Sequence, residues 1–336
     1  MVRKLRWGIL STAKIGLKQV MPAIKQSKNG VLAALASRSL ESAQEAAAPF
    51  GIPHVFGSYE EMLASPEVDA VYVPLPNAMH KEWTIRAANH GKHVLCEKPL
   101  ALNAAEADEM ITAARQNHVL LMEAFMYRFH PQFAKLKALI ADGAIGDVKV
   151  MRSAFCYNIQ GANNIRLDPD LGGGALMDVG CYCVNMARLV ADAEPVEVRA
   201  DATIGKSGVD ETLVGILRFP NDVVAHFDCS FRTDYREWLD VQGTKHRVDL
   251  ARPIKPGTRA ADIFLRFDET SETNPNSTLI TAPAANHYRL MVEHFADAAL
   301  NGKPLRYPPE DARANMRVID ALYESARTGR AVKIVR

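Results

Sequence analysis

An acid and a phenol stand four residues apart in the middle of the chain, in a pattern suited to chemistry on a hydroxyl group. Asp178 and Tyr182 follow a run of three glycines at 172–174. We expect a helix over 175–190, which would place the two side chains on one face at positions i and i+4. The spacing by itself fits an ordinary surface Asp–Tyr pair equally well.

A lysine at the end of a predicted strand is the second candidate group. Lys98 lies in the sequence Glu97-Lys98-Pro99, directly after the apolar run 93–96. Most lysines are solvated surface charges, but the following proline restricts this one to an extended backbone. The preceding strand, at 68–73, leads into Leu75, Pro76, Asn77 and His80. His80 alone is a weak signal, since a histidine at a helix start often only caps or packs.

The carboxyl ends of neighbouring parallel strands form the ligand crevice of an open α/β sheet. The residues just after these two strands are therefore expected to line a cofactor crevice: Leu75, Pro76, Asn77, His80, Glu97 and Lys98.

The first predicted strand runs into a turn that resembles a degenerate dinucleotide fingerprint. Aligned to G-x-G-x-x-G, the chain reads Ser11-x-Ala13-x-x-Gly16, so two of the three glycines are missing. Serine and alanine are small enough for a tight turn, and the following helix offers its N-terminal N–H groups to an anion. A plain strand–turn–helix fits the spacing equally well. The residues expected to contact a pyrophosphate are Ser11, Thr12, Ala13, Lys14 and Ile15.

The second predicted strand ends in Ser37 and Arg38, about 20 residues after the fingerprint turn. An NAD site places Asp or Glu here to hold the ribose 2′-hydroxyl, and such a carboxylate would repel a 2′-phosphate. A hydroxyl and a guanidinium would instead bind that phosphate, which favours NADP over NAD by roughly tenfold or more. The alternative is a surface arginine after a strand.

The elements that must position these groups follow from the apolar pattern. In the first part, strands are expected at 5–10, 31–37, 54–56, 68–73, 93–96 and 119–122, and helices at 14–26, 40–49, 59–64, 79–89 and 103–116. This alternation predicts βαβ units and a parallel sheet.

The second part predicts a mixed or antiparallel sheet with helices on one face. Strands are expected at 148–157, 197–204, 213–219, 223–231 and 238–242, and helices at 175–190, 287–300 and 309–328. The polar stretch 270–276 is expected to be an exposed loop. The predicted domains are 1–125, for cofactor binding, and 126–336, for substrate binding and dimerisation, and the last helix is free to return to the first domain.

Composition excludes several classes of protein. The 336 residues include 40 Lys plus Arg against 39 Asp plus Glu, so the net charge of +1 argues against a nucleic-acid or acidic-membrane binder. No apolar run reaches the ~18 residues of a membrane span, and the apolar patch 7–10 after the basic N-terminus is too short for the h-region expected of an export signal. The 5 cysteines show no metal-ligand spacing, so we expect buried thiols in a reducing cytoplasm and no metal site.

These motifs together resemble the glucose–fructose oxidoreductase/inositol dehydrogenase (Gfo/Idh/MocA) family. The matching elements are the fingerprint turn at 11–16, Pro76-Asn77-x-x-His80, Glu97-Lys98-Pro99, Tyr127-Arg128-Phe129 and Asp178-x-Gly180-x-Tyr182. The run 167–182 is typical of the NADP-linked aldose (xylose-type) dehydrogenases and dimeric dihydrodiol dehydrogenases within this family.

The resemblance implies a doubly wound α/β Rossmann domain followed by an α+β domain with an open-faced, mostly antiparallel sheet that often mediates dimerisation. It also implies that Lys98, Asp178 and Tyr182 line the catalytic pocket. The missing fingerprint glycines depart from the family pattern and concern the individual pyrophosphate contacts rather than the fold.

The chemistry expected is hydride transfer between a carbinol carbon and a nicotinamide, with the protein supplying a proton acceptor. Tyr182 is the candidate base. Lys98 is the cation that would lower the phenol pKa from about 10 by about 1–3 units. Asp178 would bind the substrate hydroxyl or orient Lys98. Arg128 is expected to bind substrate oxygens or the cofactor carboxamide, its alternative being an inter-domain salt bridge.

The expected substrate is a polyhydroxylated ring, with an aldose oxidised at C1 favoured and a trans-dihydrodiol or keto-sugar as alternatives. Polar and aromatic side chains available to such a pocket are Tyr157, Asn158, Asn163, Arg166, Tyr235 and Trp238. Two rival functions stay open: a non-enzymatic NADP-binding sensor on the same fold, and a reductase of a non-sugar carbonyl or imine.

Overall fold

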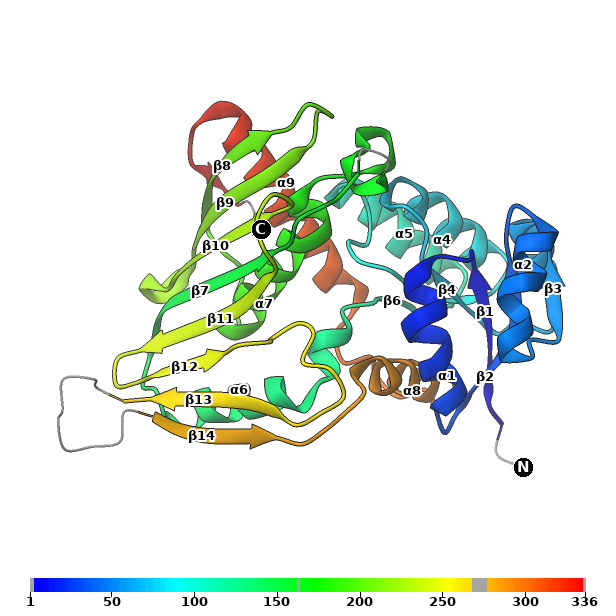
Figure 1. Ribbon diagram of the computed structural model, residues 1–336, viewed down its shortest axis with the longest axis horizontal. Coiled ribbons are helices and arrows are strands. Elements are labelled where there is room, and N and C mark those ends of the chain that lie inside the picture. Colours follow the sequence, from blue (N-terminus) through cyan, green and yellow to red (C-terminus); the bar gives the residue numbers. More distant parts are fainter. Residues whose placement is uncertain (1–2, 162–163, 268–276, 335–336) are drawn as a thin grey trace. The chain divides into compact units, whose positions relative to one another are not determined.

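The computed structural model describes residues 3–161, 164–267 and 277–334 (Figure 1). The chain divides into two compact units. The first comprises Met1–Met126 with Asn286–Met316, and the second comprises Tyr127–Ala285 with Arg317–Arg336. The predicted loop at 270–276 and the pocket candidate Asn163 lie outside the described residues.

The first unit is built on a six-stranded parallel sheet in the order β3-β2-β1-β4-β5-β6. The strands are β1 (Leu5–Leu10), β2 (Gly30–Ala36), β3 (His54–Phe56), β4 (Ala70–Val73), β5 (His93–Cys96) and β6 (Leu121–Glu123). The order reverses between β1 and β4, which is where open α/β sheets bind their ligands. The parallel sheet predicted from the sequence is confirmed.

The connecting helices of the first unit are α1 (Met21–Gln26), α2 (Leu40–Ala47), α3 (Tyr59–Ala64), α4 (His80–Asn89), α5 (Ala104–Gln116) and α8 (His287–Asn301). Helix α1 continues a π-helical turn at Gly16–Val20. Although it comes late in the chain, α8 packs here, with the rings of Phe295 and Trp7 5.3 Å apart. Helix α9 (Pro309–Thr328) begins in this unit and passes into the second at Arg317.

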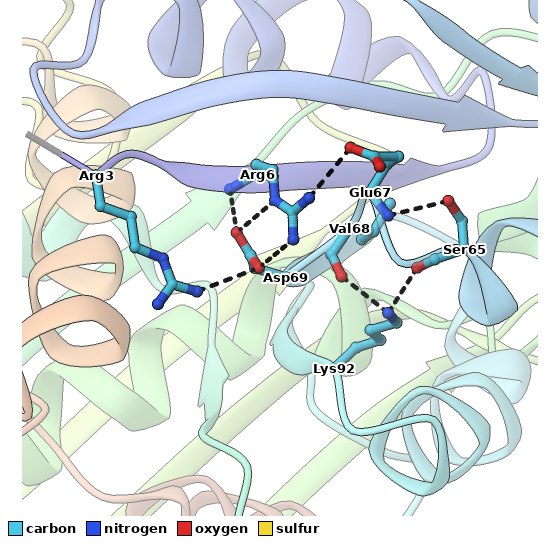
Figure 2. Close-up of polar contacts among 7 residues, drawn as sticks. All are labelled: Arg3, Arg6, Ser65, Glu67, Val68, Asp69 and Lys92. Carbon is cyan, nitrogen blue, oxygen red and sulfur yellow. Dashed lines mark hydrogen bonds and ion pairs between the residues drawn. The ribbon is translucent and has the colours of Figure 1, made fainter. Parts of the chain in front are cut away.

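The amino-terminal ends of the strands in the first unit are tied together by a polar cluster, which Figure 2 shows in close-up. Asp69, just before β4, accepts hydrogen bonds from the Arg6 backbone N–H (3.0 Å), Nε (3.1 Å) and Nη2 (2.8 Å) on β1. Lys92, just before β5, donates to the carbonyl oxygens of Ser65 and Val68, both at 2.8 Å. These polar contacts stabilise the amino-terminal end of the sheet. Ligands of open α/β sheets bind at the opposite, carboxyl end of the strands.

The second unit contains a nine-stranded sheet in the order β14-β13-β12-β11-β7-β10-β9-β8-β15. The strands are β7 (Val148–Cys156), β8 (Glu197–Ile204), β9 (Asp210–Arg218), β10 (Val224–Ser230), β11 (Arg236–Gly243), β12 (Arg247–Leu250), β13 (Ala261–Arg266), β14 (Ser277–Ala282) and β15 (Val332–Lys333). Only the pair of β10 with β7 is parallel among these described strands. The predicted mixed, mostly antiparallel sheet is thus confirmed.

Helices cover one face of this second sheet. Helix α7 (Cys181–Ala191) packs on β7 and β10, and α6 (Pro131–Ala141) packs on β13 and β14. Successive side chains of β7 point to opposite faces of the sheet, so that Phe155, which packs on Tyr182 of α7, faces the helices while Arg152 and Ala154 lie on the other face. The apolar pattern of the sequence did not predict α6, β12, β13, β14 and β15.

Candidate active site

The turn after β1 has Ser11, at the position of the first fingerprint glycine, in a conformation that glycine adopts readily. Ser11 has a backbone φ of 106°, a region that side-chain-bearing residues rarely occupy. It is held there because its N–H donates to the Ala36 carbonyl (2.9 Å) and its hydroxyl accepts from the Ala13 N–H (3.2 Å). Serine thus takes the conformation that glycine normally provides, and supplies a turn-closing hydrogen bond that glycine lacks.

The remaining turn residues lie at the start of the helix that leads into α1. Thr12, Ala13 and Ile15 are half-buried, Lys14 is exposed, and Gly16 is buried. The Leu17 N–H donates to the Ala13 carbonyl at 3.1 Å, so the helix begins directly after the turn. Its first N–H groups have no intrahelical acceptor, which makes this end suited to a phosphate.

Ser37 and Arg38 follow β2 at the same end of the sheet. The Ser37 N–H donates to the Phe56 carbonyl at 3.2 Å, and the Arg38 side chain is exposed. Burial raises the pKa of Tyr59, and the positive charge of Arg38 partly opposes that rise, so guanidinium and phenol are near each other. The segment 36–39 carries no carboxylate.

His80 connects the segments that follow β4 and β5. Its Nδ1 lies 2.9 Å from the Pro99 carbonyl oxygen and its Nε2 lies 2.9 Å from the Leu75 carbonyl oxygen. The side chain is fully buried, and burial lowers its pKa. His80 therefore fixes the two loops and has no exposed atom of its own, while Leu75, Pro76 and Asn77 form the short segment that it holds.

The Glu97-Lys98-Pro99 segment is fixed by neighbouring strands. The Glu97 N–H donates to the Val73 carbonyl (3.1 Å), and the Tyr72 hydroxyl donates to Glu97 Oε1 (2.6 Å). The Lys98 N–H donates to Glu97 Oε2 at 3.3 Å, and the Lys98–Pro99 peptide bond is cis. The backbone that carries the half-buried Lys98 is thus set by β4 and β5.

In the second unit, Asp178 and Tyr182 lie on a continuous helix whose first part is a π-helix, Leu176–Gly180, before α7 begins. A single π-helical segment within a helix is frequent at functional sites. Tyr182 is 4% exposed, and its ring packs edge-on to Phe155 at 5.6 Å. The helix predicted at 175–190 is confirmed, with this local change of pitch.

Asp178 is the centre of a polar cluster that joins the helix to the loop before it. Its Oδ2 accepts a hydrogen bond from the Tyr157 hydroxyl (2.6 Å) and another from Arg166 Nε (2.8 Å). The Arg166 side chain is 42% exposed and that of Asp178 15%. Such charge-assisted bonds orient both partners.

Arg166 brings a cation to Tyr182 within this unit. The negative charge of Asp178 raises the pKa of Arg166 above its ordinary value, and Tyr157 and Tyr182 lie near enough to contribute to this rise. Conversely, burial and the Asp178 charge raise the pKa of Tyr157, which stays a hydrogen-bond donor. The sequence reading named Lys98 as the cation for Tyr182 and gave Arg166 only as one of several pocket candidates.

The other candidates are distributed over the second unit. Tyr235 lies beside Phe155, with ring centroids 6.3 Å apart, whereas Trp238 pairs with Ala154 and lies on the face of the sheet opposite Phe155. Asn158 is exposed, and Arg128 is half-buried in the 3₁₀ turn Met126–Phe129.

Comparisons with known proteins identify the family. Residues 5–125 match the model of the oxidoreductase family with NAD-binding Rossmann fold, GFO/IDH/MocA, and residues 133–249 match the model of the GFO/IDH/MocA C-terminal domain. The chain belongs to the GFO/IDH/MocA oxidoreductase family. The family and the fold class predicted from the sequence are therefore confirmed, and the chain is an oxidoreductase.

Three relatives show the range of activities close to this chain. It is 41% identical to D-xylose 1-dehydrogenase (NADP(+)) 2 of Haloferax volcanii, over 98% of this chain and 100% of that one. It is 40% identical to trans-1,2-dihydrobenzene-1,2-diol dehydrogenase of Xenopus tropicalis, over 73% and 74% of the two chains. A solved 3-ketoreductase from Actinomadura kijaniata, in complex with NADP and TDP-benzene, superposes with a TM-score of 0.91 at 29% identity, covering 96% and 98%.

Other features of the described residues bear on the class of site. All five cysteines are buried free thiols. Across residues 3–161, 164–267 and 277–334 no cluster of three or more His, Cys, Asp or Glu side chains is arranged to hold a metal ion. Within the same part of the chain, no helix has the length and apolar character that a membrane crossing requires.

Proposed function

We propose that this oxidoreductase transfers a hydride between NADP and a CH–OH carbon of a sugar or cyclic polyol, with C1 of an aldose the favoured position. The observation that carries the proposal is the Asp178 cluster. In it the Arg166 guanidinium and the Tyr157 phenol bind the Asp178 carboxylate, which lies four residues before Tyr182 on the same helix. The names of the relatives support the substrate class and the cofactor.

The residues after β1 and β2 fit a dinucleotide with a 2′-phosphate. Ser11 forms the tight turn, and the N-terminal end of the helix behind it suits the pyrophosphate. The exposed Arg38 and the hydroxyl of Ser37 follow β2 with no carboxylate beside them, which suits an anionic 2′-phosphate. Leu75, Pro76, Asn77 and Glu97 line the crevice beyond this turn.

When bound, the nicotinamide supplies the hydride acceptor, and the chain supplies position and proton transfer. Tyr182 accepts the proton from the substrate hydroxyl in oxidation and returns it in reduction. Its phenol needs a lowered pKa for this task, and a cation within about 4–6 Å provides it. We assign this role to Lys98, assisted by Arg166. Asp178 orients Arg166 and accepts a hydrogen bond from a substrate hydroxyl, and Arg128 binds substrate oxygens or the carboxamide.

The aldose assignment has two alternatives on the same site: a trans-dihydrodiol dehydrogenase and a keto-sugar reductase. The names of two proteins above, a trans-1,2-dihydrobenzene-1,2-diol dehydrogenase and a 3-ketoreductase, support these alternatives. A non-enzymatic NADP sensor is disfavoured, because it has no need for the Arg166–Asp178–Tyr157 cluster in the second unit.

We also propose that the chain forms a homodimer through the open face of the second sheet, and that it is cytoplasmic. One row across neighbouring strands runs Arg199, Ile216, His226, Arg152, Asp240, Asp249, Phe264 and Leu279. Ile216 is 39% and Leu279 54% exposed, in the same row as side chains of both charges. A second copy of the chain would cover such a mixed face. The five free thiols agree with a reducing compartment.

The direct test is a spectrophotometric scan at 340 nm with NADP and a panel of aldoses, inositols and trans-dihydrodiols, and with NADPH and keto-sugars. Turnover of at least one aldose is expected. Tight NADPH binding without turnover of any compound would contradict the proposal and favour the sensor.

Replacement of Tyr182 by phenylalanine tests the assignment of the base. We expect Tyr182→Phe to lower kcat by about 10²–10⁴-fold while NADP affinity is kept. The ring packing against Phe155 needs no hydroxyl and is kept in this variant. Wild-type turnover in this variant would transfer the acid/base role to Lys98.

A further inference from the structure

Asp210, at the first position of β9, is a buried carboxylate outside the predicted site. It is 3% exposed. Its Oδ2 accepts a hydrogen bond from the Leu176 N–H (2.7 Å), and its Oδ1 accepts one from the Tyr323 hydroxyl of α9 (2.9 Å). The Ala175 N–H donates to it as well. Asp210 therefore caps the start of the helix that carries Asp178 and Tyr182.

Gly174, next to this cap, connects both arms of the Asp178 cluster. Its N–H donates to the Arg166 carbonyl (2.9 Å), and its own carbonyl accepts from the Asp178 N–H (3.0 Å). Its φ is +122°, and a Cβ built on it would overlap Asp210 Oδ1 and lie 2.9 Å from the Tyr323 hydroxyl. The carboxylate thus fills the space that a side chain at 174 would need, and the turn and Asp210 fix each other.

Burial disfavours the ionised form of the Asp210 carboxyl group. Burial raises its pKa to about 6, and the hydrogen bonds from Leu176 and Tyr323 only partly oppose this rise. The titratable groups that face it are Tyr323 from α9 and Cys229 from β10, whose own pKa values burial raises, so both stay neutral. Because the folded pKa exceeds the unfolded value, ionisation of Asp210 lowers the stability of the native state as pH rises from about 4 to about 6.

We propose that Asp210 is a positioning residue for the reaction: its ionised carboxylate holds the Gly174–Leu176 turn, and through that turn the Arg166–Asp178 pair and Tyr182. It touches neither substrate nor cofactor. The inference rests on the proposed function for its kinetic test, and on the geometry of the turn for its structural test.

The test compares Asp210→Asn and Asp210→Ala with the wild type, using NADP and whichever aldose or diol the substrate panel identifies. Asparagine keeps an acceptor for the Leu176 N–H and a donor for Tyr323, but it has no charge. Alanine keeps neither. We expect kcat to fall in the order wild type, Asn, Ala, by up to about 100-fold for Ala, with an unchanged Kd for NADPH measured by fluorescence. The wild type should lose kcat as pH falls through about 6, and this acid limb should be absent in Asp210→Asn.

Thermal stability separates positioning from a structural role. The melting temperature of Asp210→Asn at neutral pH should equal or exceed that of the wild type, although its kcat is lower. Glu237→Gln is the matched control. Glu237 is also a buried carboxylate, 4% exposed, that accepts from two backbone N–H groups, those of Ile254 (3.1 Å) and Lys255 (2.8 Å). Its replacement should leave the acid limb in place.

A kcat loss that simply follows a lower melting temperature, or an acid limb that persists in Asp210→Asn, overturns the inference. If the wild type itself turns over no sugar or diol, the proposed function fails. A crystal structure of Asp210→Ala then decides the positioning question alone: the bonds from the Gly174 N–H to Arg166 and from Arg166 to Asp178 should be broken or lengthened, and an unchanged turn would contradict the inference.

Discussion

Replacement of Asp69 by asparagine tests how the first unit is held together at the amino-terminal ends of its strands. The carboxylate accepts three hydrogen bonds from Arg6 and is 13% exposed, whereas the Arg6 side chain is 37% exposed (Figure 2). A hydrogen bond to a charged group contributes about 1.5–3 kcal/mol and a neutral one about 0.5–1.5 kcal/mol. Solvent screening at the half-exposed arginine reduces the difference. We therefore expect a loss of about 1–2 kcal/mol, or about 2–8 °C in melting temperature.

The pH dependence of this loss has a definite sign. Burial raises the pKa of Asp69, but the hydrogen bonds from Arg6 outweigh burial and hold the pKa below its ordinary value. The stabilisation is therefore present above the unfolded pKa of about 3.9 and disappears as pH falls through the folded value. Thermal denaturation at a series of pH values should show the gap between wild type and Asp69→Asn closing in acid.

Glu67→Gln provides the control in the same cluster. Glu67 accepts from Arg6 Nη1 at 3.1 Å, but it is 48% exposed, so its removal should change the free energy of unfolding by less than about 1 kcal/mol. Equal losses for the two variants, or an Asp69→Asn gap that is independent of pH, would refute the reasoning.

Three further predictions concern the sites themselves. Ser11→Gly relieves a backbone φ of 106° but loses the bond to the Ala13 N–H, so the free energy of unfolding should change by less than about 1 kcal/mol and the affinity for NADP by less than about tenfold. A larger loss of either quantity would contradict the glycine-like turn. Arg38→Asp should lower the ratio of NADP to NAD affinity by at least about tenfold, measured by fluorescence titration, and an unchanged ratio would remove Arg38 from the 2′-phosphate site. Arg166→Gln should lower kcat by about tenfold or more and keep the affinity for NADPH, because Asp178 loses the hydrogen bond from Arg166 Nε. An unaltered kcat would show that the guanidinium does not act on Tyr182.

The strand tips of the first unit could be predicted because their signals are local. Continuous apolar runs such as Ala70–Val73 indicate strands covered on both faces, and the prolines and polar residues that follow mark their carboxyl ends. The parallel arrangement then brings Asn77 and Lys98 to the same edge without further information.

The conformation of Ser11 and the role of His80 could not be predicted from the sequence. A serine in place of a fingerprint glycine is a visible departure in the sequence, but only the hydrogen bonds to Ala36 and Ala13 reveal that the glycine geometry is kept. His80 could be placed near the strand tips, whereas its full burial between two carbonyl oxygens depends on the tertiary structure.

The second unit was harder to predict because its strands are polar on one face and its site is assembled from distant segments. Strand β14, Ser277–Ala282, is mostly half-buried or exposed and carries little apolar alternation. The Arg166–Asp178 bond joins a loop without periodic pattern to a helix, and Asp210 lies before the apolar part of its strand, so no local signal links either of them to Tyr182.

The central claim is that the ammonium group of Lys98 and the phenol of Tyr182 act together on the substrate. A crystal structure of the complex with NADP and the substrate identified by the panel measures it directly, as the distance between Lys98 Nζ and Tyr182 Oη. The account predicts a separation of no more than about 6 Å, with both groups directed at the reacting hydroxyl. A much larger separation, or a Lys98 side chain directed away from that hydroxyl, would contradict it.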